Sequence, residues 1–102
     1  MINWDRVNEL KDEIGAEDFP EVVEIFLEEV DGTFDRLKAA GAAPGQDDFH
    51  FLKGSALNLG FEELGTLCQD NELRAASGQD VVALEPVLDV YEKSKAAFLA
   101  QL

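Results

Sequence analysis

The stretch Phe19–Leu37, FPEVVEIFLEEVDGTFDRL, decides the fold. Its apolar residues recur at spacings of 3, 1, 3, 4, 4 and 3, which place them on one face of an α-helix. These residues are Phe19, Val22, Val23, Phe26, Val30, Phe34 and Leu37. Asp18 stands at the cap, Pro20 in the first turn and Glu21 three residues after the cap, so a capped helix is expected over 19–40. A helix of this kind must bury its apolar face against other helices.

The same spacing continues on both sides of this stretch. It predicts a short helix over about 3–14 and longer helices over about 46–60, 62–77 and 81–101. The residues expected to face inward are Trp4, Val7, Leu10 and Ile14, then Phe49, Leu52, Ala56 and Leu59, then Leu64, Leu67, Cys68, Asn71 and Ala75, and last Leu84, Val87, Leu88, Tyr91, Phe98 and Leu102.

Capping and breaking residues mark where these helices begin and end. Asn3 and Asp80 are expected to cap the first and last helices. The expected helix ends are the glycines Gly15, Gly41, Gly60 and Gly78. Pro86 leaves two alternatives open: the last helix kinks there, or its regular part begins just before it.

No alternating strand pattern appears in the sequence, and the loops between helices are short. Short loops favour antiparallel neighbours. We therefore expect an all-α fold, a single domain over 1–102, built as an antiparallel up-down four-helix bundle with the short N-terminal helix as a lid.

Composition excludes several classes of function. The chain has 102 residues, of which 46% are hydrophobic, and its formal charge is 8 − 22 = −14. This charge repels nucleic-acid phosphates and anionic lipid, so neither nucleic acid nor a membrane is expected as a partner. A single cysteine, no visible signal peptide and no long apolar run predict a cytoplasmic protein.

Metal chemistry is not expected either. Asp47 and His50 have the spacing of half of an acidic metal motif. A di-metal bundle needs a second histidine and inward-facing carboxylates, and the chain has one histidine. We expect no metal site and no cofactor of the protein's own.

A second stripe on the third helix breaks the pattern. His50, Gly54, Leu57 and Phe61 follow at i, i+4, i+7 and i+11, turned away from the predicted core. A glycine inside a helix costs up to about 1 kcal/mol relative to alanine, and an outward glycine has no packing role to offset this. The pattern suggests that a partner approaches the backbone beside His50. Alternatively, Phe51, Leu57 and Phe61 are buried under the first helix.

Charged neighbours complete the candidate site. Lys53 lies one turn after His50, where an ammonium would stabilise an anion attached to the imidazole. If the chain reverses near Phe61, Glu72 lies opposite His50, with Gln69 one turn earlier. Either could accept a hydrogen bond from Nδ1–H and leave Nε2 as the nucleophile.

The stretch His50–Gly60, HFLKGSALNLG, resembles the phosphorylation motif of histidine-containing phosphotransfer (HPt) domains. These are helical-bundle carriers of multistep phosphorelays, and the resemblance covers nearly the whole chain. It implies that His50 accepts phosphate, that Lys53 steadies the phosphoryl oxygens and that Gly54 admits the partner. Glutamate at position 72 departs from the glutamine frequent in the family.

The resemblance implies that the partners are receiver domains of response regulators and hybrid kinases, which supply the phosphoaspartate and Mg²⁺. The partner-binding residues expected are Phe51, Leu57, Asn58 and Phe61. No nucleotide-binding motif is present, so we expect no ATP-dependent kinase activity. Two alternatives remain: a receiver-binding module that is not phosphorylated, and the dimerising phosphoacceptor region of a histidine kinase. The second would require a stable homodimer, whereas four core helices can close a bundle as a monomer.

Overall fold

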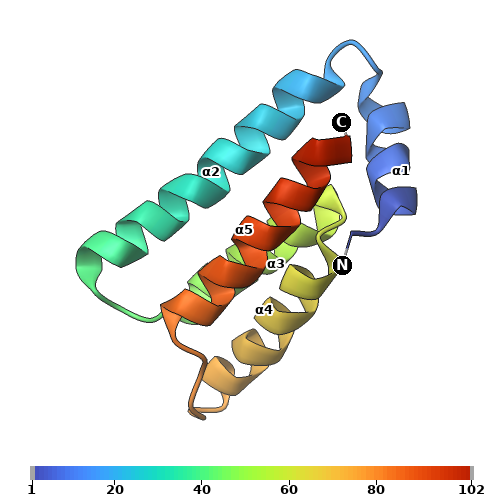
Figure 1. Cartoon of the computed structure of the whole chain (residues 1–102). Coiled ribbons are helices and arrows are strands. Elements are labelled where there is room, and N and C mark those ends of the chain that lie inside the picture. The colour runs from blue at the N-terminus through green and yellow to red at the C-terminus, as the bar shows by residue number, and fades with distance from the viewer. Residues whose placement is uncertain (1, 102) are drawn as a thin grey trace.

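The computed structural model describes residues 2–101, and within them the fold is all-α, as predicted. An isolated bridge between Ile2 and Phe61 is the single β-type contact in this range. Figure 1 shows α2 to α5 lying alongside one another, successive helices running in opposite directions, with α1 at one end. The helices are α1 (Trp4–Ile14), α2 (Phe19–Ala40), α3 (Gln46–Leu59), α4 (Glu62–Ala76) and α5 (Leu84–Gln101).

Helix contacts form a ring. α3 packs against α2 and most extensively against α4, while α5 packs against α4 and α2. The α3–α4 edge therefore lies across the ring from the α2–α5 edge. α1 packs on α3 and α2, and its Trp4 ring stacks on Phe98 of α5 at 5.9 Å. Within residues 2–101, every helix is too short or too polar to cross a membrane.

The predicted core positions of α3 are all buried, and those of the other helices are mostly so. In α2, the buried set includes Leu27, which the spacing analysis missed, while Val22 and Phe26 are half-buried. The observed core stripe passes from Val23 through Leu27 to Val30 in steps of four and three. It therefore follows the helix axis more closely than the predicted stripe through Phe26. Leu102, predicted to face inward, lies outside the described residues.

The start of α5 corrects one prediction. The helix begins at Leu84 and not near residue 81, so Asp80 does not cap it. The preceding loop is held differently: Val82 N donates to Asn71 Oδ1 of α4 at 2.9 Å. Pro86 is then the third helical residue, where a backbone N–H has no intrahelical acceptor to lose. Of the two alternatives for Pro86, the structure has the one in which the regular helix begins just before it.

The other two predicted N-caps, Asn3 and Asp18, have different outcomes. Asn3 has an extended backbone, and its Oδ1 accepts from Arg6 N at 3.2 Å, as expected of a cap. Asp18 has a helical backbone and makes no side-chain cap bond, so that part of the prediction is wrong. A side-chain cap requires an extended residue. The turn before α2 instead closes through the backbone, with Phe19 N donating to Gly15 O at 3.0 Å.

The turn at Gly60 fixes the α3–α4 hairpin and the position of α1. Gly60 has a left-handed φ of 79°, and the following Phe61 N donates to Ala56 O at 2.7 Å. Gly60 O accepts from Asn3 N, also at 2.7 Å. A Cβ at Gly60 would lie 2.6 Å from Asn3 O, which is backbone and cannot swing aside. The N-terminal segment thus packs directly against a position that only glycine can occupy.

We expect Gly60→Ala to lower the free energy of unfolding by about 2 kcal/mol or more, because it adds left-handed strain and a backbone clash. Gly54→Ala is the matched control on the same helix: its Cβ would meet nothing within 4 Å, and stability should be unchanged or rise by up to about 1 kcal/mol. Urea unfolding followed by circular dichroism measures both. Equal stability of the two variants would contradict the proposed role of the Gly60 turn.

Candidate functional site

His50 projects from α3 into solvent, with 71% of its side chain exposed. Its Nδ1 lies 2.9 Å from Glu72 Oε2 on α4, a separation that fits Nδ1–H donating to the carboxylate. The antiparallel α3–α4 hairpin turns at Gly60 and Phe61, and this register places the two residues opposite each other, as the sequence predicted. With Nδ1 occupied as a donor, the ring's other nitrogen, Nε2, carries the free lone pair.

Lys53 contacts the same carboxylate. Its Nζ lies 2.7 Å from Glu72 Oε1, so the two oxygens of Glu72 are divided between the imidazole and the ammonium. Both side chains are largely covered, with 25% of Lys53 and 18% of Glu72 exposed. The ammonium is therefore held by an ion pair on the same carboxylate that contacts His50.

Electrostatics keep this carboxylate ionised. The hydrogen bond from Lys53, and next the one from His50, hold the pKa of Glu72 below its usual range despite some desolvation. Cys68, one turn earlier on α4, behaves oppositely: burial first, and then the Glu72 charge, raise the pKa of its thiol to about 12. A protonated thiol is a poor nucleophile, so Cys68 fills the core, and His50 is the available nucleophile of this surface.

The surface beside His50 is open and partly apolar. A Cβ at Gly54 would meet nothing within 4 Å, so the backbone is accessible one turn from the imidazole. Phe51 and Leu57 are exposed by 36% and 49%. Asn58 is also exposed, and its Oδ1 lies 3.4 Å from Arg6 Nη2 of α1. Three of the four predicted partner-binding residues therefore reach the surface.

Phe61 does not. It is fully buried, and its ring packs on Phe98 at 5.4 Å and on Tyr91 at 6.3 Å. The prediction extended the α3 stripe past its end: the chain turns at Gly60, so the helical spacing no longer applies at residue 61. Gln69 also lies apart from the predicted contact. It is exposed, and among the described residues Glu72 alone hydrogen-bonds His50.

The sequence analysis missed two residues that neighbour this surface. Gly65 is buried on α4, and a Cβ there would lie 2.9 Å from the Leu57 side chain, so the glycine lets Leu57 lie across the helix pair. Its helical position between Leu64 and Cys68 could have indicated close packing. Leu73, next to Glu72, has 62% of its surface exposed. An isolated outward leucine gives no periodic signal, so spacing could not have marked it.

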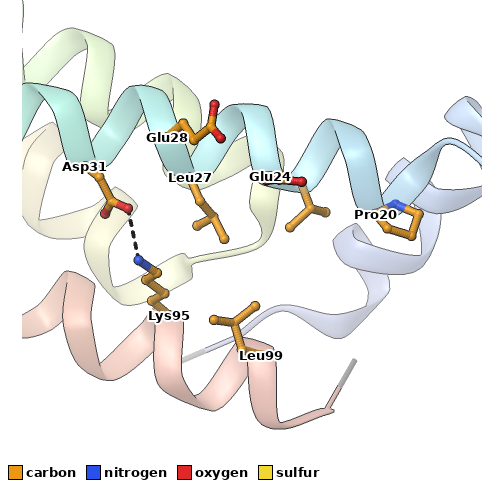
Figure 2. Close-up of a pocket in the computed structure, with 8 residues that line it drawn as sticks. Pro20, Glu24, Leu27, Glu28, Asp31, Lys95 and Leu99 are labelled. Atoms are coloured by element: carbon orange, nitrogen blue, oxygen red, sulfur yellow. Dashed lines mark hydrogen bonds and ion pairs between the residues drawn. The ribbon is translucent and has the colours of Figure 1, made fainter.

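Outside the His50 surface, the described residues form a hollow but no metal-binding cluster. Among the described residues, no group of three or more His, Cys, Asp or Glu side chains is placed to hold a metal ion. Figure 2 shows a hollow between α2 and α5, where Leu27 and Leu99 face each other and Lys95 Nζ pairs with Asp31 Oδ2 at 3.0 Å. None of the residues that line this hollow belongs to α3 or α4, so it is separate from the His50 surface.

Comparison with known proteins identifies relatives. The family model described as "Hpt domain" matches residues 21–100. A protein named "Phosphorelay protein LuxU" from Vibrio vulnificus strain YJ016 is 30% identical over 110 residues, covering 98% of this chain and 93% of the relative. The protein of the same name from strain CMCP6 matches equally. No solved structure matches the chain significantly.

The Glu72 contact predicts the tautomer of His50. In the neutral ring Nδ1 should carry the proton and Nε2 should not, and ¹⁵N NMR of the imidazole distinguishes the two nitrogens directly. Glu72→Ala should shift the ring toward the tautomer protonated at Nε2, whereas Glu63→Gln, an exposed change near the start of the same helix, should leave it unchanged. A wild-type ring protonated mainly at Nε2 would show that this contact does not set the tautomer.

Proposed function

Because this chain belongs to the Hpt domain family, we propose that it is a phosphoryl carrier of a multistep phosphorelay, with His50 as the residue that accepts phosphate. One observation carries the proposal. The imidazole is the exposed nucleophile of the surface that α3 and α4 form around His50, here called the α3–α4 face. Its Nδ1 contacts Glu72, and Nε2 is left free beside accessible backbone at Gly54. The two relatives, each named "Phosphorelay protein LuxU", agree with this function.

In the proposed reaction, a receiver domain docks with its phosphoaspartate over His50. The Nε2 lone pair attacks phosphorus in line, the P–N bond forms, and the P–O bond breaks with its electron pair leaving on the aspartate carboxylate. Nδ1 keeps its proton throughout, within the hydrogen bond to Glu72. Reversal of these steps on a second receiver passes the group onward.

The protein's contribution is position and charge. Lys53, held on the carboxylate that also contacts His50, neutralises phosphoryl oxygens in this proposal, while the receiver supplies Mg²⁺ and the carboxylate, so this chain needs neither its own metal nor ATP. Gly54 admits the partner, and Phe51, Leu57 and Asn58 are the surface against which the receiver packs. We propose that a cytoplasmic monomer, an up-down four-helix bundle with α1 as its lid, carries out this transfer.

His50→Gln should abolish labelling, because an amide nitrogen is not nucleophilic. The measurement is transfer of an acid-labile ³²P label from a receiver charged with acetyl phosphate. The exposed position of the ring predicts an unchanged circular dichroism spectrum and melting temperature. An acid-labile label retained by the variant would place the phosphoacceptor elsewhere and overturn the proposal.

Gly54→Gln should slow transfer at least about tenfold while leaving stability within about 1 kcal/mol of wild type, since a Cβ there meets nothing within 4 Å in this protein but the longer side chain would meet a docked partner. Gly32→Gln is the matched control: Gly32 is an exposed α2 glycine whose Cβ also meets nothing, and it is not part of the α3–α4 face. The transfer rates of the two variants are compared in quenched time courses with one receiver. Equal rates would show that access at Gly54 is not required, and unfolding of Gly54→Gln would contradict its outward placement.

A further inference from the structure

Glu72 has two partners in the unphosphorylated protein, and phosphorylation would alter both contacts. Its Oε2 accepts from His50 Nδ1 at 2.9 Å, and its Oε1 pairs with Lys53 Nζ at 2.7 Å. Only 18% of the Glu72 side chain is exposed, so water competes weakly for these oxygens. The carboxylate is thus positioned to respond to a change of charge on either neighbour.

Attachment of a phosphoryl group at Nε2 makes the ring an imidazolium as long as Nδ1 keeps its proton. In that form the P–N bond breaks with its electron pair on Nε2, and neutral imidazole leaves. If Nδ1 has lost its proton, the leaving group would have to be the far more basic imidazolate. The proton on Nδ1 therefore decides whether the group can be passed on.

We infer that the carboxylate of Glu72 holds the proton on Nδ1 of phosphorylated His50, and that this positioning residue thereby sets how readily the phosphoryl group departs to the next receiver. The inference rests on the proposed function, because it requires phosphate on His50. An ionised carboxylate within hydrogen-bond distance stabilises a cationic ring far more than a neutral amide oxygen would. Glu72 then assists release of the group, in addition to setting the tautomer in which the free ring accepts it.

Lys53 links the strength of the Glu72–Nδ1 hydrogen bond to whether His50 carries a phosphoryl group. In the unphosphorylated state its ammonium partly neutralises Glu72. The phosphoryl oxygens carry more negative charge than one carboxylate, so they draw Lys53 away from Oε1 once the group is attached. Glu72 then interacts undivided with Nδ1–H. The charged groups at the ring are Glu72 from α4, which contacts Nδ1, and Lys53 from α3, which pairs with Glu72; the exposed Asp47 lies one turn before His50 on α3.

The test compares the full-length wild type with Glu72→Gln and Glu63→Gln, each charged by the small donor phosphoramidate. Glutamine keeps the size and an acceptor oxygen, and Glu63→Gln removes one exposed carboxylate from the same helix. The ³¹P resonance of the phosphohistidine is followed against pH, and loss of the group to an unphosphorylated receiver is timed in parallel.

In Glu72→Gln the ring should lose its proton at least about one pH unit lower than in wild type, and above both midpoints transfer to the receiver should be about tenfold slower. Glu63→Gln should match wild type in both measurements. A merely structural role for Glu72 would not move the midpoint of this titration.

The possible failures are separable. Equal midpoints for wild type and Glu72→Gln would overturn the inference and leave the proposed function intact. Complete failure of Glu72→Gln alone to become charged would confine the role of Glu72 to acceptance and also overturn the inference. If the wild type itself takes no phosphate on His50, the proposed function fails, and the inference fails with it.

Discussion

The tight turn at Gly60 is the constraint on which the site and the lid both depend. Its left-handed backbone reverses the chain between α3 and α4, and the register it fixes brings His50 within 2.9 Å of Glu72. The same glycine accepts the Asn3 amide, so the start of α1 is attached where the hairpin turns. A shift of one residue in this turn would rotate Glu72 by about 100° around α4 and break the contact with the imidazole.

Two helical glycines on the α3–α4 pair serve opposite needs. Gly65 is buried and leaves room for Leu57 to lie across α4, which keeps the helices close. Gly54 faces solvent, where its missing side chain benefits no contact within this protein. Since a helical glycine costs stability in both places, packing explains the buried one, and for the exposed one we propose access for a second molecule.

Predictions from the sequence succeeded where helical periodicity or the register of the hairpin decides the position of a residue. They failed at positions where the chain enters or leaves a helix. The α3 core and the opposition of His50 and Glu72 follow from 100° per residue and one turn position. Phe61 was misplaced because the helical spacing was carried through a left-handed glycine into a non-helical residue. The start of α5 depends on Asn71 binding Val82 N, a contact between segments that no local propensity encodes.

Charge acts on this protein over two ranges. The formal charge of −14 creates a long-range field, but salt screens it beyond about 8 Å, so it influences which partners approach more than the chemistry at His50. At the site, Lys53 and Glu72 cancel each other before phosphate arrives. In the proposed phosphorylated state, the added negative charge would be offset by Lys53 and by the imidazolium ring, with Glu72 as the counter-charge of that ring.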